Sequence, residues 1–441
     1  MTLQNSNDKA KTSLLEFQEN LSDFRQLENG LRLVISPMSH TRSVTVSFYI
    51  GAGSRYECNE QAGISHIVEH ACFKGSKHWP TAQHISEAIE GVGGVLNAAT
   101  DRELTVYYAK VPQNHLKLAL NIITDIAINP VFDTGELEKE RKVILEELAA
   151  VEDNPAQLVE IDLDGLLWPR NPLGRDVAGT PETVQSIPHQ QIVDYHRRQY
   201  TAHNAVISVA GAVEPDAVAD SIKDITTEWE QASPGSWVPS IPFDPKNKRI
   251  HVRTKKTEQA NVMIGIPGVH ATHIDRYTIG LLASALGDGM SSRLFLKIRE
   301  ELGLAYDVSA YTSNFQDTGS FSVYLGVDPR NVLPAVRACL DELSHIRTGI
   351  THTELTKVRE HIKGRMLLSM EDTRSVSSWH GAQTLLLGQS RSIDEVVAEL
   401  DAITEEDLSR VANSLIQDDH LHLAVVGPFT EEAPFRDILH F

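Results

Sequence analysis

The stretch "SIPHQQIVDYHRRQYTAHNAVISVAG", residues 186–211, has a diverged counterpart near the end of the chain, "AITEEDLSRVANSLIQDDHLHLAVVG", residues 402–427. Each stretch combines a polar helix start, an amphipathic helix and a short strand that ends at a glycine, Gly211 or Gly427. Two such related units in one chain indicate an internal duplication.

Both halves of the chain also begin alike, with two predicted strands, and a predicted helix follows each pair. The strands are "LRLVISP" and "SVTVSFYIGAG" (31–37 and 43–53) in the first half, and "RIHVRTK" and "QANVMIGIPG" (249–255 and 259–268) in the second. Strand pairs, several helices and a closing strand are typical of an α+β layer with helices on one side of a largely antiparallel sheet. The pattern predicts an α+β fold of two homologous domains.

A proline-rich stretch, "WEQASPGSWVPSIPFDPKNK" at residues 229–248, separates the two halves. It holds four prolines and one glycine without sustained periodicity, which is typical of a linker. The predicted organisation is therefore an N-terminal leader segment (1–21), a first domain (22–228), the linker (229–248) and a second domain (249–441). We expect the leader segment to pack on the fold, but its role does not follow from the sequence.

Composition and charge exclude several classes of partner. The 441 residues include 40 Lys and Arg against 60 Asp and Glu, a formal net charge of -20, which would repel a nucleic-acid backbone. No apolar run approaches the roughly 18 residues of a membrane span. The first 21 residues lack the features of a secretory signal, and the three cysteines form no disulfide framework. We expect a cytoplasmic protein that binds neither nucleic acid nor membrane.

The pentad "HIVEH", residues 66–70, lies in a stretch with the pattern of an amphipathic helix. On a helix His66 and His70 are four residues apart and project from one face, close enough for both imidazoles to bind one ion. Glu69 lies on the same face and could take a proton from a metal-activated water. By itself the pentad is also compatible with polar residues that face solvent.

A catalytic zinc needs a third protein ligand, for which a glutamate is suitable. The strongly helical stretch "ELEKERKVILEELAAVEDNP", residues 136–155, offers six glutamates, at positions 136, 138, 140, 146, 147 and 152. Such a stretch is also typical of a charged, solvated helix face. Sequence chemistry alone leaves the choice among these glutamates open.

Together the pentad and "ERKVILEE", whose last glutamate lies 77 residues after His70, resemble the pitrilysin family of zinc peptidases with the inverted H-x-x-E-H motif. Within that family the chain resembles the bacterial two-domain type, which is related to the beta subunit of the mitochondrial processing peptidase. The resemblance implies one Zn²⁺ per chain bound by His66, His70 and Glu147, with Glu69 as general base. It also implies that Glu140, two turns before Glu147, supports the site from close by.

The same resemblance implies roles for residues outside the metal site. "GGVLNAATDRELTVYYAKV", residues 93–111, is similar to the edge strand to which a substrate peptide adds, with Asn97 and Ala98 in contact with substrate. In the second half, "SSRLFLKIREELGLAYDVSAY" resembles a stretch whose Arg and Tyr, here Arg299 and Tyr306, hold the substrate and its developing oxyanion.

The same stretch has a pattern of its own. Leu294, Phe295, Ile298 and Leu302 form the predicted buried stripe of the helix that carries Arg299, and Gly303 is suited to end that helix.

The predicted function is therefore zinc-dependent endopeptidase, cleaving peptides or unfolded segments in a clamshell whose two domains complete the site on closing. We expect a homodimer. Three alternatives remain: an inactive scaffold of the same fold, an active subunit that requires a homologous partner in a heterodimer, and a zinc hydrolase that does not cleave peptides. The physiological substrate, the cleavage preference and the oligomeric state do not follow from the sequence.

Overall fold

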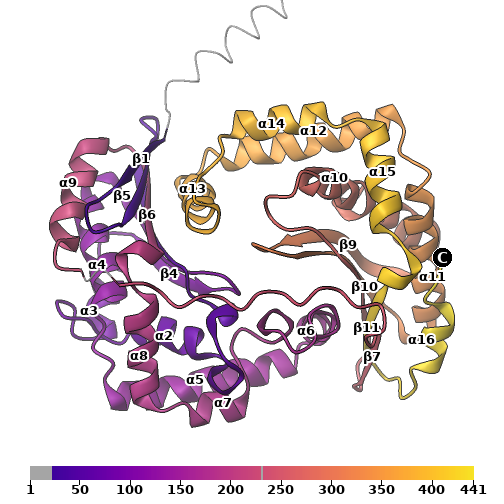
Figure 1. Ribbon diagram of the computed structural model, residues 1–441, viewed down its shortest axis with the longest axis horizontal. Helices are drawn as coiled ribbons and strands as arrows, with labels where there is room; N and C mark the ends of the chain where they lie inside the picture. Colours follow the sequence, from indigo (N-terminus) through magenta and orange to yellow (C-terminus); the bar gives the residue numbers. More distant parts are fainter. Residues whose placement is uncertain (1–21, 230–231) are drawn as a thin grey trace, which may run out of the picture.

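A computed structural model describes residues 22–229 and 232–441 (Figure 1). The leader segment predicted at residues 1–21, and residues 230–231 of the predicted linker, lie outside the described residues. Between helix α9 (Pro215–Thr226) and strand β7 (Ile250–Thr254), the described residues of the linker form neither helix nor strand. Figure 1 shows this segment running from the first half of the chain across to the second.

The first half is built on a sheet in the order β1-β2-β6-β3-β5-β4. Its strands β2 and β6 are parallel, and the other neighbours are antiparallel. The strands are β1 (Asp23–Gln26), β2 (Arg32–Pro37), β3 (Ser43–Ile50), β4 (Val95–Thr100), β5 (Thr105–Pro112) and β6 (Ala205–Gly211).

The second half repeats this arrangement in a sheet of order β7-β11-β8-β10-β9. Its remaining strands are β8 (Ala260–Pro267), β9 (Ala305–Asn314), β10 (Gly319–Val327) and β11 (His422–Gly427). Strands β7 and β11 are the parallel pair, and the other neighbours are antiparallel, as in the first sheet. The duplicated α+β fold predicted from the two halves of the sequence is thus confirmed.

Most helices of each half lie on one side of that half's own sheet, some against its strands and others packed outside them (Figure 1). The first half contributes α2 (Ile64–Cys72), α3 (Ala82–Glu90), α4 (Leu116–Ile128), α5 (Thr134–Glu152), α7 (Pro181–Ser186), α8 (His189–Gln199) and α9. The second contributes α10 (Arg276–Gly287), a π-helical segment (Phe295–Glu301), α11 (Val332–Ile346), α12 (His352–Ser369), α14 (Ile393–Ala402), α15 (Glu405–Leu415) and α16 (Ala433–Ile438). None of the described helices is long and apolar enough to span a membrane.

The opposite face of each sheet is covered by a helix from the other half. Helix α6 (Pro155–Leu167) of the first half packs on β8 and β11 of the second sheet. Helix α13 (Thr373–Leu387), its counterpart in chain order, packs on β2, β3 and β6 of the first (Figure 1). The two halves therefore exchange equivalent helices, which the sequence patterns did not predict.

The two exchanged contacts differ in chemistry. Helix α6 presents leucines to an apolar cluster that includes Met263 and Val426, and Gly265 gives Leu163 room against β8. Helix α13 instead presents hydroxyl groups to β3. The Thr373 hydroxyl lies 2.9 Å from that of Thr45, which is fully buried.

One turn further along α13, the Ser377 hydroxyl donates to the carbonyl oxygen of Ser208 at 3.0 Å and lies 2.8 Å from the hydroxyl of Ser47. Because buried hydroxyls need such partners, this face fixes how far α13 is displaced along the sheet.

A buried arginine also joins the halves. The Arg55 guanidinium, with no exposed surface, forms ion pairs with Glu103 in the β4–β5 turn and with Asp317 in the β9–β10 turn, the latter at 2.5 Å. Its guanidinium carbon lies 4.2 Å from the ring centroid of Trp237 in the linker. The tips of the two equivalent hairpins and the linker thus meet at one cation.

We expect Gly381→Ala to separate α13 from the first sheet. A Cβ at Gly381 would lie 2.3 Å from Cε2 of Tyr49 and 2.9 Å from Cβ of Ser208. Overpacking of this kind costs about 1–3 kcal/mol of unfolding free energy. Urea denaturation followed by circular dichroism measures the loss.

The matched control is Gly364→Ala in α12, where no described atom lies within 4 Å of the added Cβ. There alanine should stabilise the helix by about 1 kcal/mol, since glycine is the poorer helix former. A Gly381→Ala protein as stable as the Gly364→Ala protein would contradict the close packing of α13.

Candidate metal centre

The position of α2 is set from both sides of the helix. Its apolar residues Ile64, Ile67 and Val68 are fully buried in the core of the first half. At its start, the Glu57 carboxylate accepts the backbone N–H groups of Gly63 and Ser65, each at 2.9 Å. Glu57 is buried and caps the helix from outside, a role that sequence reasoning missed.

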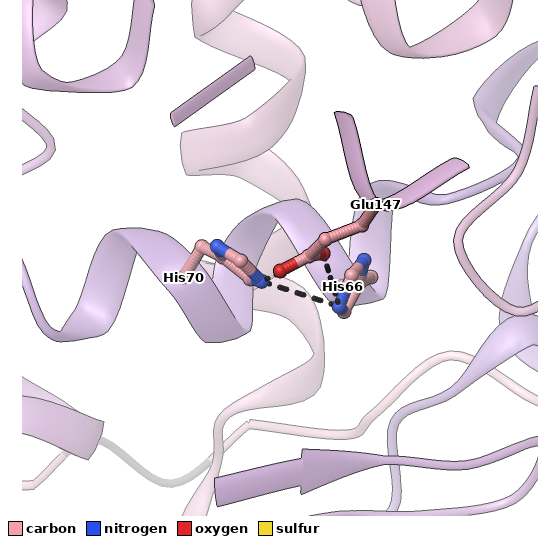
Figure 2. A group of neighbouring side chains, drawn as sticks. All are labelled: His66, His70 and Glu147. Atoms are coloured by element: carbon pink, nitrogen blue, oxygen red, sulfur yellow. Dashed lines mark hydrogen bonds and ion pairs between the residues drawn. The ribbon is translucent and has the colours of Figure 1, made fainter. Parts of the chain in front are cut away.

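The structure brings His66, His70 and Glu147 together, with one ligand atom of each within 4.8 Å of the others. Figure 2 shows the two imidazoles projecting from α2 and the Glu147 carboxylate reaching them from the neighbouring helix α5. The Nε2 atoms of His66 and His70 lie 3.2 Å apart. Oε2 of Glu147 lies 3.7 Å from Nε2 of His66 and 3.6 Å from Nε2 of His70.

These distances suit zinc. Ligand atoms at about 2.0–2.2 Å from a tetrahedral zinc ion lie about 3.3–3.6 Å from one another. Two imidazole nitrogens and one carboxylate oxygen also form a ligand set that zinc accepts, with a fourth position left for water or substrate. The three side chains therefore fit the ion in both chemistry and spacing.

The protonation state of His66 favours metal binding. Burial, together with the neighbouring His70, lowers the pKa of His66 to about 4. At neutral pH the imidazole is therefore uncharged, so one ring nitrogen keeps a lone pair for a cation.

Glu140 lies directly behind His70. Its Oε2 is 3.0 Å from Nδ1 of His70, its Oε1 is 2.7 Å from Nζ of Lys74, and the residue is only 6% exposed. When Nδ1–H donates to Glu140, the lone pair of His70 is on Nε2, on the side of His66 and Glu147. The next glutamate in the chain, Glu146, is exposed and belongs to no cluster of metal-binding groups among the described residues.

Glu69 lies beside these side chains without being one of them. Burial raises the pKa of the Glu69 carboxyl, against the opposing effects of Thr100 and His70. The Thr100 hydroxyl donates to Oε2 of Glu69 at 2.5 Å. Thr100 ends strand β4, so this bond ties Glu69 to the edge of the sheet. Sequence reasoning missed Thr100, although it belongs to the same short stretch as Asn97.

Asn97 and Ala98 lie on β4, which is the edge strand of its sheet as predicted. Alternation along the strand places Ala98 on the same face as Thr100 and Asn97 on the opposite face. The Asn97 side chain accepts the backbone N–H of Ala98 at 2.8 Å. The structure therefore brings Ala98, but not the side chain of Asn97, to the metal-binding face of the sheet.

Arg299 and Tyr306 lie together in the second half. The Arg299 guanidinium carbon is 5.3 Å from the ring centroid of Tyr306, whose side chain is 73% exposed. Among the described residues, no hydrogen bond or ion pair joins Arg299 or Tyr306 to the metal-binding side chains.

The predicted buried stripe beside Arg299 needs one correction, because Leu302 is 43% exposed. The segment is π-helical, with the N–H of Leu302 bonded to the carbonyl of Lys297 at 3.0 Å. This wider turn moves residue 302 off the face of Leu294 and Ile298, which are buried.

Comparison with known protein families identifies both halves of the chain. Residues 33–181 match the family described as insulinase (peptidase family M16), and residues 186–362 match the domain described as peptidase M16 inactive domain. The metal-binding side chains all lie within the first match.

Individual relatives agree. The chain is 35% identical to YmxG of Bacillus subtilis, an uncharacterized zinc protease, over 91% of this chain and 97% of that protein. An uncharacterized zinc protease of Streptomyces coelicolor is 34% identical over 93% and 90%. A crystal structure of a protease from Helicobacter pylori shares the fold with a TM-score of 0.86 at 23% identity, over 93% of this chain and all of that one.

We expect Glu147→Gln and Glu146→Gln to differ sharply in zinc affinity. An amide at position 147 removes the anionic ligand, so affinity should fall by more than the roughly 10–100-fold that loss of an outer hydrogen-bond partner costs. The same change at the exposed neighbour should leave affinity unchanged. Competition with a chromophoric chelator measures both. Equal affinities in the two variants would exclude Glu147 as a ligand.

Proposed function

The chain belongs to the insulinase family of peptidases, M16, and from this we propose that it is a zinc-dependent endopeptidase of peptides and unfolded segments, with one Zn²⁺ per chain. The observation that carries the proposal is the convergence of His66, His70 and Glu147 at zinc spacing. The carboxylate of Glu69 lies close enough to His70 and Glu147 to interact with both electrostatically. The relatives named zinc protease support the metal and the class of reaction.

Glu69 is the proposed general base. Zinc bound by the three side chains supplies Lewis-acid chemistry, polarising the scissile carbonyl and making water a stronger acid. Thr100 holds Oε2 of Glu69, which leaves Oε1 to take a proton from the attacking water and deliver it to the departing amine. A carboxyl whose pKa burial raises is a stronger base than an ordinary one, which suits the first of these steps.

The edge of β4 is the proposed binding site for the substrate backbone. An edge strand presents unpaired backbone N–H and C=O groups, to which an extended peptide can add as a further strand. Because Thr100 at the end of β4 holds Glu69, a peptide on this edge would pass next to the general base. We propose that Ala98 and Asn97 line the two faces of that peptide.

Arg299 and Tyr306 are proposed to hold the substrate and its oxyanion from outside the first half. If the two halves of one chain closed on each other as in the predicted clamshell, α6 and α13 would have to slide over the sheets they cover. The ion pairs of Arg55 would also be disturbed. A second copy of the chain avoids this cost. We therefore propose a homodimer in which each chain presents Arg299 and Tyr306 to the metal site of the other.

The alternative of an inactive scaffold is less well supported. The word inactive belongs to the family description matched by residues 186–362, which does not include the metal-binding side chains. The counterpart of α2 in the second half is α10, "RYTIGLLASALG", which has neither histidine nor glutamate. An active first half and a second half without ligands agree with a peptidase. We keep the proposal that it acts in the cytoplasm.

We expect Glu69→Gln to bind zinc as tightly as the unchanged chain and to lose about 10²–10⁴-fold in peptide cleavage, the usual contribution of a general base. Metal analysis and the cleavage of a quenched fluorescent peptide measure the two properties. Glu146→Gln is the control that should keep both. Cleavage by Glu69→Gln at the unchanged rate would exclude the mechanism.

Chains that carry Glu69→Gln and Arg299→Ala, each with its own affinity tag, test the homodimer after co-expression. Each variant alone should be strongly impaired. Protein purified through both tags should regain about half of the normal activity, because one of its two sites keeps an intact Glu69 and an intact Arg299 from the other chain. Two results would contradict completion of the site across two chains: doubly tagged protein that has no activity, or failure to recover any doubly tagged protein.

A further inference from the structure

A pocket of about 760 Å³ lies between α13 and the start of α10. Its volume falls in the range of ligand-binding pockets. Three arginines line it, Arg276, Arg374 and Arg391, together with the rings of Tyr277 and Trp379. These three cations line one pocket of a chain whose formal net charge is -20.

Two of these arginines share one carboxylate. Glu399 accepts both ends of the Arg391 guanidinium, at 2.6 and 2.5 Å, and also the Arg276 guanidinium at 3.2 Å. One negative charge thus faces two positive ones. A second carboxylate, that of Glu395, also lies close enough to Arg391 to act on it electrostatically.

The third arginine has no anionic partner among the described residues. The acidic residue that lines the pocket, Asp372, already has other partners: its Oδ1 caps α13 by accepting the N–H groups of Arg374 and Ser375, and its Oδ2 pairs with Lys110. The guanidinium carbon of Arg374 lies 4.1 Å from the ring centroid of Tyr108. Stacking uses the face of a guanidinium and leaves its in-plane N–H donors free for a carboxylate.

The position of Tyr108 connects the pocket to the substrate edge. Tyr108 on β5 lies directly opposite Asn97 on β4, so both side chains project from the same face of the sheet. Neighbouring strands are about 4.8 Å apart, so a peptide added to β4 would lie about 10 Å from β5. A side chain or chain end of that peptide could span this distance to Arg374.

We propose that this pocket binds a carboxylate of the peptide substrate through the guanidinium of Arg374. The carboxylate is that of an acidic side chain or of the substrate's C-terminus. A planar guanidinium binds it through two parallel hydrogen bonds. The inference rests on the proposed endopeptidase function and adds a charge preference to it.

The first measurement is a cleavage-site profile of the unchanged chain on a peptide mixture, read by mass spectrometry. Acidic side chains or free C-termini should be enriched at a fixed distance from the scissile bond. The best substrate is then compared with its Glu→Gln form and with its C-terminal amide. We expect kcat/KM to be about 10-fold lower for the peptide form that lacks the bound carboxylate. This factor is typical for the loss of one charge-assisted hydrogen bond.

In the Arg374→Gln variant of the protein, the ratio of kcat/KM between the acidic peptide and its neutral form should fall to about 2-fold or less. Arg330→Gln is the matched control, because it removes the same charge from an exposed site outside the pocket, and it should keep the full ratio. Binding of the same peptides to the Glu69→Gln chain, measured by fluorescence anisotropy, should show the same preference without turnover.

The outcomes separate the two proposals. If the unchanged chain cleaves no peptide, the proposed function fails. If peptides are cleaved, but removal of the acidic group does not lower kcat/KM and Arg374→Gln does not alter that comparison, the proposed endopeptidase function stands and the carboxylate pocket is overturned. If kcat/KM falls when the C-terminus of the peptide is amidated, the pocket binds the C-terminal carboxylate. If it falls when the peptide's glutamate is replaced by glutamine, the pocket binds an acidic side chain.

Discussion

The exchange of α6 and α13 is the contact on which the rest of the structure depends. A sheet covered by helices on one face still has a second face to bury, and each half here buries that face with the other half's helix. The metal centre depends on the same exchange. Helix α5 carries Glu140 and Glu147 and ends at Glu152, and α6 begins at Pro155. Packing of α6 on the second sheet therefore anchors the end of α5 nearest to Glu147.

Much of the metal site could be predicted because its spacing is local. Residues four apart on α2 must share a face, and so must Glu140 and Glu147, two turns apart on α5. Which of six glutamates would face α2 depends on the packing of two helices, which chain periodicity does not encode. The resemblance to a peptidase family supplied that choice, and the distances between His66, His70 and Glu147 agree with it.

The helix exchange could not be predicted, because the strands that α13 covers have the residue pattern of strands with one solvent-exposed face. In β3, "SVTVSFYI", apolar residues alternate with Thr45 and Ser47, as in a strand with one face in water. Both faces are buried, since α13 satisfies those hydroxyls with its own. Thr100 and Glu57 escaped notice for a similar reason, because their partners lie on other elements. Leu302 was misplaced because a π-helical turn breaks the assumed period.

The same exchange constrains the order in which the protein can fold during synthesis. Strand β6 completes the first sheet at Gly211, but α13, which covers its second face, begins only at Thr373, roughly 160 residues and some ten seconds or more of translation later. Over that interval α6 also has no sheet to dock on. The nascent first half thus carries an uncovered sheet face and an undocked apolar helix, and the far end of α5 has no anchor. The ribosome must deliver the C-terminal half before the N-terminal half can hold its metal ligands firmly in place.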